Sequence, residues 1–513
     1  MSEYSLIIRR LNKDEENTDM IVGRENRKRA GNQVIRFRKH PRRIQKSGGF
    51  LVNDIHSKLN PVLVNRIVPV DSAEAIQNIV REARQGGKTI SISGGRHAMG
   101  GQQFGTDTVL IDTTKLNRVL DFDTKEGILE VEAGIKWPEL IEYLHKAREG
   151  RLTKWGITQK QTGADRLSIG GAIGANIHGR GLCFKPIIQD VESLVLIDEN
   201  SKLHLCSRTQ NPELFRLVIG GYGLFGVIYS VRLRLTPRRK LRRVVEVIDI
   251  KELMPSFEHR IEEGFLYGDF QYNTDSDSDC FLSKGVFSCY EPVSEDTLIP
   301  EGQRSLSAED WKRLIHLAHT NKKKAFELYS AHYLSTSGQI YWSDTHQLST
   351  YIDDYHRLLD RQLGSKDRAT EMITEIYVPR NALVSFVEDV RKDFLENNVD
   401  LIYGTIRLIE KDEESFLAWA KESYACVIFN LHVIHNAPGL ERAANDFRRL
   451  IDRGIQYGGS YYLTYHKYAT LRQVLSCYPN FPEFLKLKKK YDPEERFQSD
   501  WYRHYRKMFA DLM

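Results

Sequence analysis

The sequence predicts an α+β fold divided between two domains. The chain has 513 residues, which is more than one compact hydrophobic core commonly accommodates. Amphipathic helical segments alternate with strand-like segments along most of its length. Pro237 and the basic run at residues 238–243 interrupt this pattern. These three observations place a domain boundary near residue 240.

Composition excludes several classes of protein. Hydrophobic residues make up 41% of the chain and charged residues 28%, as in ordinary globular proteins. A net charge of +5 is small for this length and does not indicate nucleic-acid binding. Apolar runs are too short for a membrane span, and the N-terminal one is too short for a secretory signal. We therefore expect a cytoplasmic protein without a membrane span.

The cysteines lack the spacing of a disulfide framework or a metal site. No two of them form a CxxC pair, so we expect free thiols in a reducing compartment and no structural zinc. The six positions are Cys183, Cys206, Cys280, Cys289, Cys426 and Cys477.

Positive charge is concentrated in residues 1–54. Between Arg24 and Lys46, eight basic residues are opposed only by Glu25. We expect a solvated basic arm, with contact to an anionic partner or membrane surface as the alternative.

A strand, helix and strand are predicted over residues 65–93. Residues 65–69 read as a strand ending at proline, and a capping box is expected in which Asp71 caps the helix and Glu74 reaches back. Gly86 follows the helix as a stop signal, and residues 89–93 form the next strand. The buried helical face is predicted from the spacing of Ile76, Ile79, Val80 and Ala83.

Strand patterns continue on both sides of the boundary, and Trp137 begins a helix with proline in its first turn. Before the boundary the strands are predicted at residues 108–112, 127–132, 190–198 and 226–235. After it they are predicted at residues 265–272, 371–378, 401–409 and 425–434.

Three glycine clusters carry the chemistry of the first domain. The first, residues 93–103, follows a strand and places His97 among four glycines. Glycine has no Cβ, so this backbone is able to approach a phosphate closely. The second lies at residues 162–181 and the third at Gly220–Gly226. None fits the GxGxxG pattern of a Rossmann domain.

The order of these clusters resembles the FAD-binding domain of the vanillyl-alcohol oxidase family, the PCMH-type flavoproteins. The ending from Asp492 to Asp500 resembles that of bacterial FAD-linked oxidases related to decaprenylphosphoryl-ribose, aldonolactone and alditol oxidases. The resemblance implies a PCMH-type FAD-binding fold with a cap domain built on an antiparallel sheet flanked by helices. The implied divisions are an arm at 1–54, an FAD domain at 55–240, a cap at 241–459 and a returning segment at 460–513.

The resemblance also implies how FAD is held. His97 aligns with the family's attachment histidine, which implies covalent FAD, the alternative being a histidine hydrogen-bonded near the phosphates. Ala164 stands where members with a second attachment have cysteine, so at most one bond is expected. The implied FAD-binding residues are Ser93, Gly94, Gly95, Arg96, His97, Ala98, Met99, Gly163, Ser168, Gly170, Gly171, Gly174, His178, Gly223, Ile228 and Tyr462.

The implied reaction is hydride transfer from an alcohol carbon of a sugar, polyol or related natural product to flavin N5. Oxygen or another acceptor then takes the electrons. Amine oxidation and flavin binding without turnover are the alternatives.

Three residues are candidates for catalysis. Arg407 is expected as a cation at the flavin or substrate, with a surface salt bridge as the alternative. Tyr465 or His466 is expected at the reacting carbon, with core packing as the alternative. Tyr465 falls where decaprenylphosphoryl-ribose oxidases place a lysine, which leaves the substrate open. His432 and His435 lie on opposite faces of a strand, so at most one faces the site.

Overall fold

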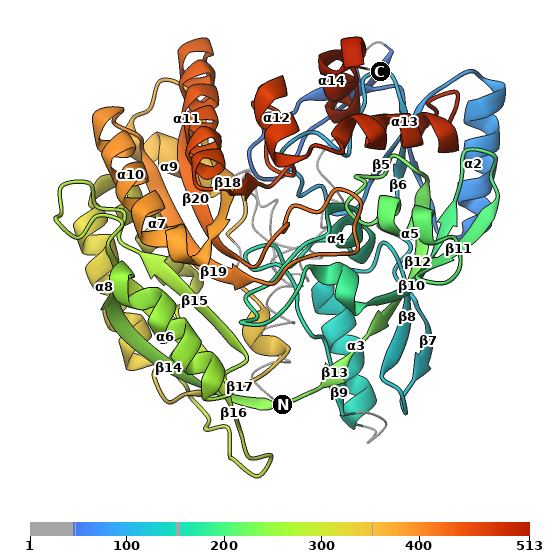
Figure 1. The fold of residues 1–513 in the computed structure, drawn as a ribbon. Helices are drawn as coiled ribbons and strands as arrows, with labels where there is room; N and C mark the ends of the chain where they lie inside the picture. The colour runs from blue at the N-terminus through green and yellow to red at the C-terminus, as the bar shows by residue number, and fades with distance from the viewer. Residues whose placement is uncertain (1–44, 47, 150–153, 351, 513) are drawn as a thin grey trace, which may run out of the picture.

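The computed structural model describes residues 45–512 except 47, 150–153 and 351. The predicted basic residues between Arg24 and Arg43 lie outside the described part. Two lobes face each other across the molecule, with the C-terminal helices α12–α14 above the lobe that contains α2, β5 and β6 (Figure 1). The predicted α+β class with an antiparallel cap sheet is confirmed.

The first lobe begins with β1 (Gln45–Lys46), β2 (Gly49–Val52) and β3 (Val62–Val64), which form a three-stranded antiparallel sheet. A parallel sheet follows, with the order β4 (Arg66–Pro69), β6 (Val109–Asp112), β5 (Ile90–Ser93). Helix α2 (Ala73–Gln85) connects β4 to β5 and buries the predicted apolar face.

The predicted N-cap of α2 is wrong by one residue. Ser72, not Asp71, has the extended backbone of a cap, and its hydroxyl accepts a hydrogen bond from the Ala75 amide. Both residue types cap helices well, so spacing alone did not separate them.

A five-stranded antiparallel sheet completes the first lobe, and helices α3 (Trp137–Glu149), α4 (Ile169–Ala175) and α5 (Pro212–Val218) accompany it. Its strand order is β11 (Leu203–Ser207), β10 (Val191–Ile197), β12 (Val227–Arg234), β8 (Ile128–Glu132), β7 (Val119–Asp123). Strands β9 (Trp155–Gly156) and β13 (Thr236–Pro237) form a short ladder beside it. The apolar face of this sheet packs against α4, so the second glycine cluster lies next to the core.

The second lobe is built on an eight-stranded antiparallel sheet. Its strand order is β17 (Ile340–Trp342), β14 (Lys240–Asp249), β16 (Lys284–Val293), β15 (Tyr267–Tyr272), β19 (Leu401–Ile409), β20 (Tyr424–Ile434), β18 (Ala369–Pro379), β21 (Ser460–Tyr461). Helices α6 (Ile250–Glu262), α10 (Leu383–Glu396) and α11 (Ala437–Gln456) pack on one face. The other face is covered by helices α7 (Ala308–Thr320), α8 (Lys322–Ser335) and α9 (Tyr355–Leu363).

Strand periodicity decides which side chains of this sheet reach the space between the lobes. Along β18, Glu371, Ile373 and Glu375 share a face that lines a cavity. The alternate residue Ile376 is fully buried on the other face, against Gly454 of α11.

The C-terminal segment lies against the parallel sheet of the first lobe. It includes α12 (Leu471–Cys477), α13 (Phe481–Tyr491) and α14 (Asp500–Met508). The Ile90 amide donates to the Arg496 carbonyl, and the Gln498 amide donates to the Ile90 carbonyl, both over 2.7 Å. Residues 496–498 therefore pair with the edge of β5, the strand that leads into the first glycine cluster.

Candidate active site

A cavity of about 770 Å³ lies between the two lobes. This volume is within the range of small-molecule and cofactor sites. The glycine clusters line it from the first lobe, and β18, β19, β20 and helices α7–α9 line it from the second. Every residue that the sequence predicted to bind FAD lines this cavity except Ser93. The Ser93 carbonyl instead accepts from the Thr113 amide and joins β5 to β6.

The first two glycine clusters interlock. A Cβ atom on Gly94 would lie 2.0 Å from Ser168 Oγ, and one on Gly95 would lie 2.4 Å from the Arg166 carbonyl oxygen. Ser168 in turn caps α4 by accepting from the Gly171 amide. Only glycine permits this approach, so the loop and the start of α4 form one continuous wall.

His97 lies at the turn of this wall and contacts a second histidine. His97 Nδ1 is 2.7 Å from His56 Nε2, and the His97 side chain is buried. Burial first, and the neighbouring His56 second, hold the pKa of His97 well below its usual value. Burial also lowers the pKa of His56 to about 4. Both imidazoles are therefore neutral at neutral pH, and His97 Nε2 has no hydrogen-bond partner among the described residues.

Several other buried polar atoms around the first cluster lack partners. Gln102 Oε1 and Gln103 Oε1, which line the cavity, have none within the described part of the chain. Buried polar groups are normally hydrogen-bonded, so these atoms indicate a polar ligand. A Cβ added at Gly163 or Gly174 would meet open space. A glycine-lined wall with unpaired donors and acceptors fits the pyrophosphate, ribityl chain and ring of FAD.

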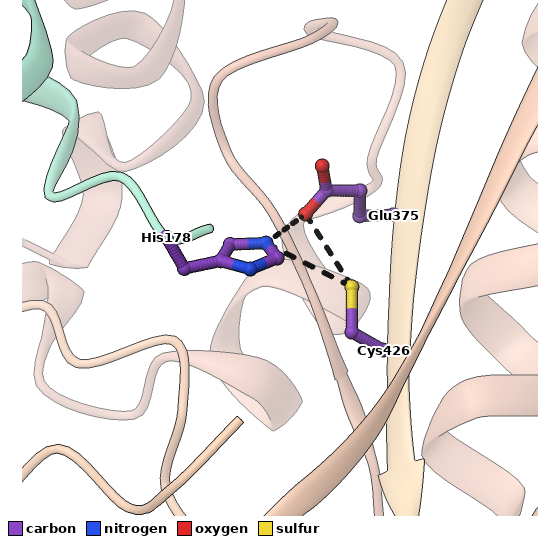
Figure 2. A group of neighbouring side chains, drawn as sticks. All are labelled: His178, Glu375 and Cys426. Carbon is purple, nitrogen blue, oxygen red and sulfur yellow. Dashed lines mark hydrogen bonds and ion pairs between the residues drawn. The ribbon is translucent and has the colours of Figure 1, made fainter. Parts of the chain in front are cut away.

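Glu375 is the centre of a hydrogen-bond network on the opposite wall. Its Oε2 contacts His178 and Cys426 (Figure 2), at 2.9 Å from His178 Nε2 and 3.6 Å from Cys426 Sγ. The Tyr377 hydroxyl donates to the same oxygen over 2.8 Å. The Tyr465 hydroxyl donates to Oε1 over 2.5 Å. Residues from four distant segments thus meet at one carboxylate.

The network fixes the charges of its members. Burial opposes the ionisation of Glu375, but the charge and hydrogen bond of His178, with the two tyrosine hydroxyls, lower the pKa of Glu375 to about 2. His178 faces the Gly179 carbonyl with Nδ1 and the carboxylate with Nε2. Burial raises the pKa of Tyr465 well above its usual value, so its hydroxyl is neutral.

His178, Glu375 and Cys426 lie close enough to one another to hold a metal ion. Their facing atoms are already engaged, because each contacts a partner within the trio or from a neighbouring tyrosine. Burial also raises the pKa of the Cys426 thiol well above its ordinary value, which disfavours the thiolate that binds metal. The trio is therefore a hydrogen-bond network.

The structure separates the three candidates for catalysis. Arg407 on β19 is 5% exposed and lines the cavity, which rules out the surface salt bridge. Tyr465 lines the cavity as well. His466 does not: its ring stacks on Phe447 at 4.4 Å, and its Nε2 lies 3.2 Å from Thr374 Oγ1. His466 is a core residue, because the loop turns between positions 465 and 466.

His432 of β20 and His435, which follows that strand, do not line the cavity. His432 faces Glu371, at 3.9 Å from Nδ1 to Oε1. His435 Nε2 lies 2.8 Å from Thr370 Oγ1. The odd spacing therefore sends them to different partners.

The sequence reasoning missed Glu375, His56 and Gln102. A signal for Glu375 was present, since Glu371 and Glu375 are four residues apart in an otherwise apolar strand and must share its face. Gln102 lies within the first cluster, but no pattern there distinguishes it from Gln103. His56 carries no motif, and only the fold brings it to His97.

The fold and the glycine-lined cavity fit the binding of FAD. Residues 64–207 match the family model described as FAD binding domain. This match covers the first two glycine clusters and confirms the predicted cofactor, FAD.

Curated relatives point to one branch of these flavoproteins. L-gulonolactone oxidase of Bos taurus is 30% identical over 193 residues, which cover 37% of this chain and 42% of the relative. D-arabinono-1,4-lactone oxidase of Yarrowia lipolytica is 28% identical over 37% of this chain and 35% of the relative. L-gulono-1,4-lactone dehydrogenase of Mycobacterium tuberculosis (H37Rv) is 24% identical over 85% of this chain and 94% of the relative. The chain thus spans less than half the length of the first two relatives and most of the third.

Two further observations concern the protein as a whole. All six cysteines are free. Among the described residues, none of the helices combines the length and the apolar character needed to cross a membrane.

Proposed function

We propose that the protein is an FAD-dependent oxidoreductase that oxidises a CH–OH group of a sugar-derived lactone, polyol or related compound. The observation that carries this proposal is the Tyr465–Glu375–His178 network, which faces the glycine-lined wall across one cavity. The names of the relatives, all lactone oxidases or dehydrogenases, favour a lactone. Bound FAD supplies the acceptor for the hydride of the substrate carbon.

Tyr465 and Glu375 remove the proton of the substrate hydroxyl. Glu375 is ionised and already accepts the Tyr465 proton in a hydrogen bond. As the substrate O–H bond breaks, its proton moves to the Tyr465 oxygen, and the Tyr465 proton moves to Glu375. His178 contacts the Glu375 carboxylate over 2.9 Å and holds it in place, so His178 is a positioning residue.

Arg407 and the second lobe bind the rest of the substrate or the flavin. Arg407 places a positive charge in the cavity wall and stabilises negative charge that develops during the reaction. The cavity also contains Asp269, Tyr329 and Tyr403. Aromatic rings with hydroxyl and carboxylate groups suit a polyhydroxylated ligand, which supports a sugar-derived substrate over an amine.

His97 is the proposed site of covalent attachment, through Nε2. Its neutral imidazole is a nucleophile, and Nδ1 is occupied by His56 while Nε2 is unpartnered among the described residues. Acid denaturation of the purified protein tests this directly. We expect the yellow colour to remain with the precipitate and to be released in a His97→Ala variant. A colourless wild-type precipitate contradicts the attachment.

We also propose the four-part division at residues 54, 240 and 459. The free cysteines are compatible with the predicted cytoplasmic location.

Turnover with an artificial electron acceptor tests the activity. We expect dye reduction with L-gulono-1,4-lactone, D-arabinono-1,4-lactone or a polyol, and none with a matched panel of amines. Reduction by amines alone favours amine oxidation, and no reduction by any compound favours a flavin-binding protein without turnover.

A further inference from the structure

A second cluster of ionisable side chains lies on the same face of β18, away from the Glu375 network. It joins Glu371 of β18 to His319 of α7 and His432 of β20. His319 Nε2 is 2.9 Å from Glu371 Oε1, and His432 Nδ1 is 3.9 Å from the same oxygen. All three atoms lie within 4.8 Å of one another.

These three atoms converge without satisfying one another. Despite their short separations, His319 Nε2, Glu371 Oε1 and His432 Nδ1 make no hydrogen bond of acceptable geometry with any described residue. The side chains of Glu371 and His319 are 4% and 3% exposed, so water does not compensate the loss. Three polar atoms that meet at one buried point without a hydrogen bond of acceptable geometry indicate a missing ligand.

The outer oxygen of Glu371 is held by neighbours. Glu371 Oε2 lies 3.0 Å from His356 Nδ1 and accepts a hydrogen bond from the Tyr355 hydroxyl. Such contacts fix the orientation of a carboxylate and leave its other oxygen directed at the two imidazoles. Supporting hydrogen bonds of this kind are typical of metal ligands.

We propose that His319 Nε2, His432 Nδ1 and Glu371 Oε1 bind a divalent transition-metal ion, with Zn²⁺ as the best match. Two imidazoles and one carboxylate form a common ligand set for zinc and for neighbouring metals in the series. The hydrogen-bonded trio around Glu375 offers no such set, since its atoms already have partners.

The metal would tie a cavity wall to the sheet. No residue of α7 or α8 is buried as a whole, although both helices line the cavity through side chains such as Trp311 and Tyr329. Glu371 and Glu375 are four residues apart on one strand, a separation of about 13 Å. The ion would therefore hold the α7–α8 hairpin over the cavity and would not act at the reacting carbon.

Metal binding by the FAD-loaded protein without an affinity tag tests the proposal. After equilibrium dialysis against Zn²⁺ and then metal-free buffer, we expect about one equivalent of zinc by mass spectrometry. His319→Asn and Glu371→Gln are expected to weaken binding by at least about tenfold. His332→Asn, on α8 of the same hairpin, is the matched control and keeps the zinc.

Co²⁺ provides a second readout that does not depend on activity. Titration of the wild type with Co²⁺ is expected to give a visible absorption band at longer wavelength than the flavin bands. The band should be absent in the His319→Asn variant, whose circular dichroism spectrum should match that of the wild type. The proposal is overturned if the wild type and the His319→Asn variant retain equal amounts of zinc. It is also overturned if the wild type binds neither Zn²⁺ nor Co²⁺. Loss of turnover with retained zinc would instead count against the proposed activity.

Discussion

The Tyr465 hydroxyl and Glu375 Oε1 lie 2.5 Å apart and join the loop after β21 to the neighbouring strand β18. Both side chains line the cavity that the glycine clusters line from the other lobe. The reactive wall therefore depends on how the returning C-terminal segment docks. It also depends on Glu375, whose charge is set by a buried partner, His178.

Tyr465→Phe removes the proton-accepting hydroxyl without altering the ring. We expect kcat to fall by about 10²-fold or more, because a positioned proton acceptor contributes that much to a hydride-transfer step. The flavin spectrum should not change. Steady-state kinetics checks this, with Tyr457→Phe on the surface as the control; equal kcat in both variants would remove Tyr465 from the mechanism.

Gly174→Ala tests where the cofactor lies. Its Cβ meets no protein atom within 4 Å, so the substitution projects into the cavity and should leave the fold intact. Alanine also favours the helix by about 1 kcal/mol. We expect unchanged or higher thermal stability and weaker FAD binding, measured by flavin content after dialysis. Gly94→Ala clashes with Ser168 instead and should lower both quantities. Full flavin content in Gly174→Ala contradicts the proposed position.

His466 should act through stability and not through catalysis. Burial first, and Arg448 second, lower the pKa of His466 from 6.5 to about 3. The unfolded chain binds a proton there below about pH 6.5, whereas the folded protein does so only near pH 3. The stability that neutral His466 contributes is thus complete above pH 6.5. It declines on acidification by up to about 1.4 kcal/mol per pH unit.

We therefore expect the melting-temperature advantage of wild type over His466→Gln to be largest at pH 8 and to shrink by pH 5. The kcat values of the two proteins should agree within about twofold, against the losses of about 10²-fold typical of acid–base residues. A large loss of kcat at unchanged stability would return His466 to the active site.

Arg407→Met tests the cationic wall. If Arg407 stabilises the reduced flavin, its removal should make the midpoint potential more negative by about 30 mV, equivalent to about 1.4 kcal/mol for two electrons. Potentiometric titration measures the shift, and Arg380→Gln, paired with Glu410 outside the cavity, serves as control. An unchanged potential with a raised KM would assign Arg407 to the substrate.

The fold could be predicted from the sequence where the spacing of neighbouring residues alone determines a helix or a strand. The spacing of Ile76, Ile79, Val80 and Ala83 gave the buried face of α2, and β19 has the predicted bounds, Leu401–Ile409. The cap of α2 could not be predicted, because Asp71 and Ser72 are adjacent residues of similar capping strength.

The site was predictable only on one wall. Each glycine cluster is one contiguous stretch of sequence, so its role in binding a cofactor can be predicted without knowledge of the fold. The opposite wall gathers Glu375, His178 and Tyr465 through strand pairing and loop docking, which no local period encodes. The same holds for His319, Glu371 and His432, whose spacing resembles no metal motif. Position 466 lies in a turn, where strand or helix periodicity does not decide direction.

One experiment measures both FAD binding in this cavity and oxidation of an alcohol carbon. The FAD-loaded protein is mixed anaerobically with L-gulono-1,4-lactone, D-arabinono-1,4-lactone and a polyol, and absorbance is followed in the flavin bands. We expect bleaching of the oxidised flavin by at least one of these compounds, slowed by about 10²-fold in Tyr465→Phe. An oxidised spectrum that persists with all of them, or protein that neither contains nor takes up FAD, would contradict it.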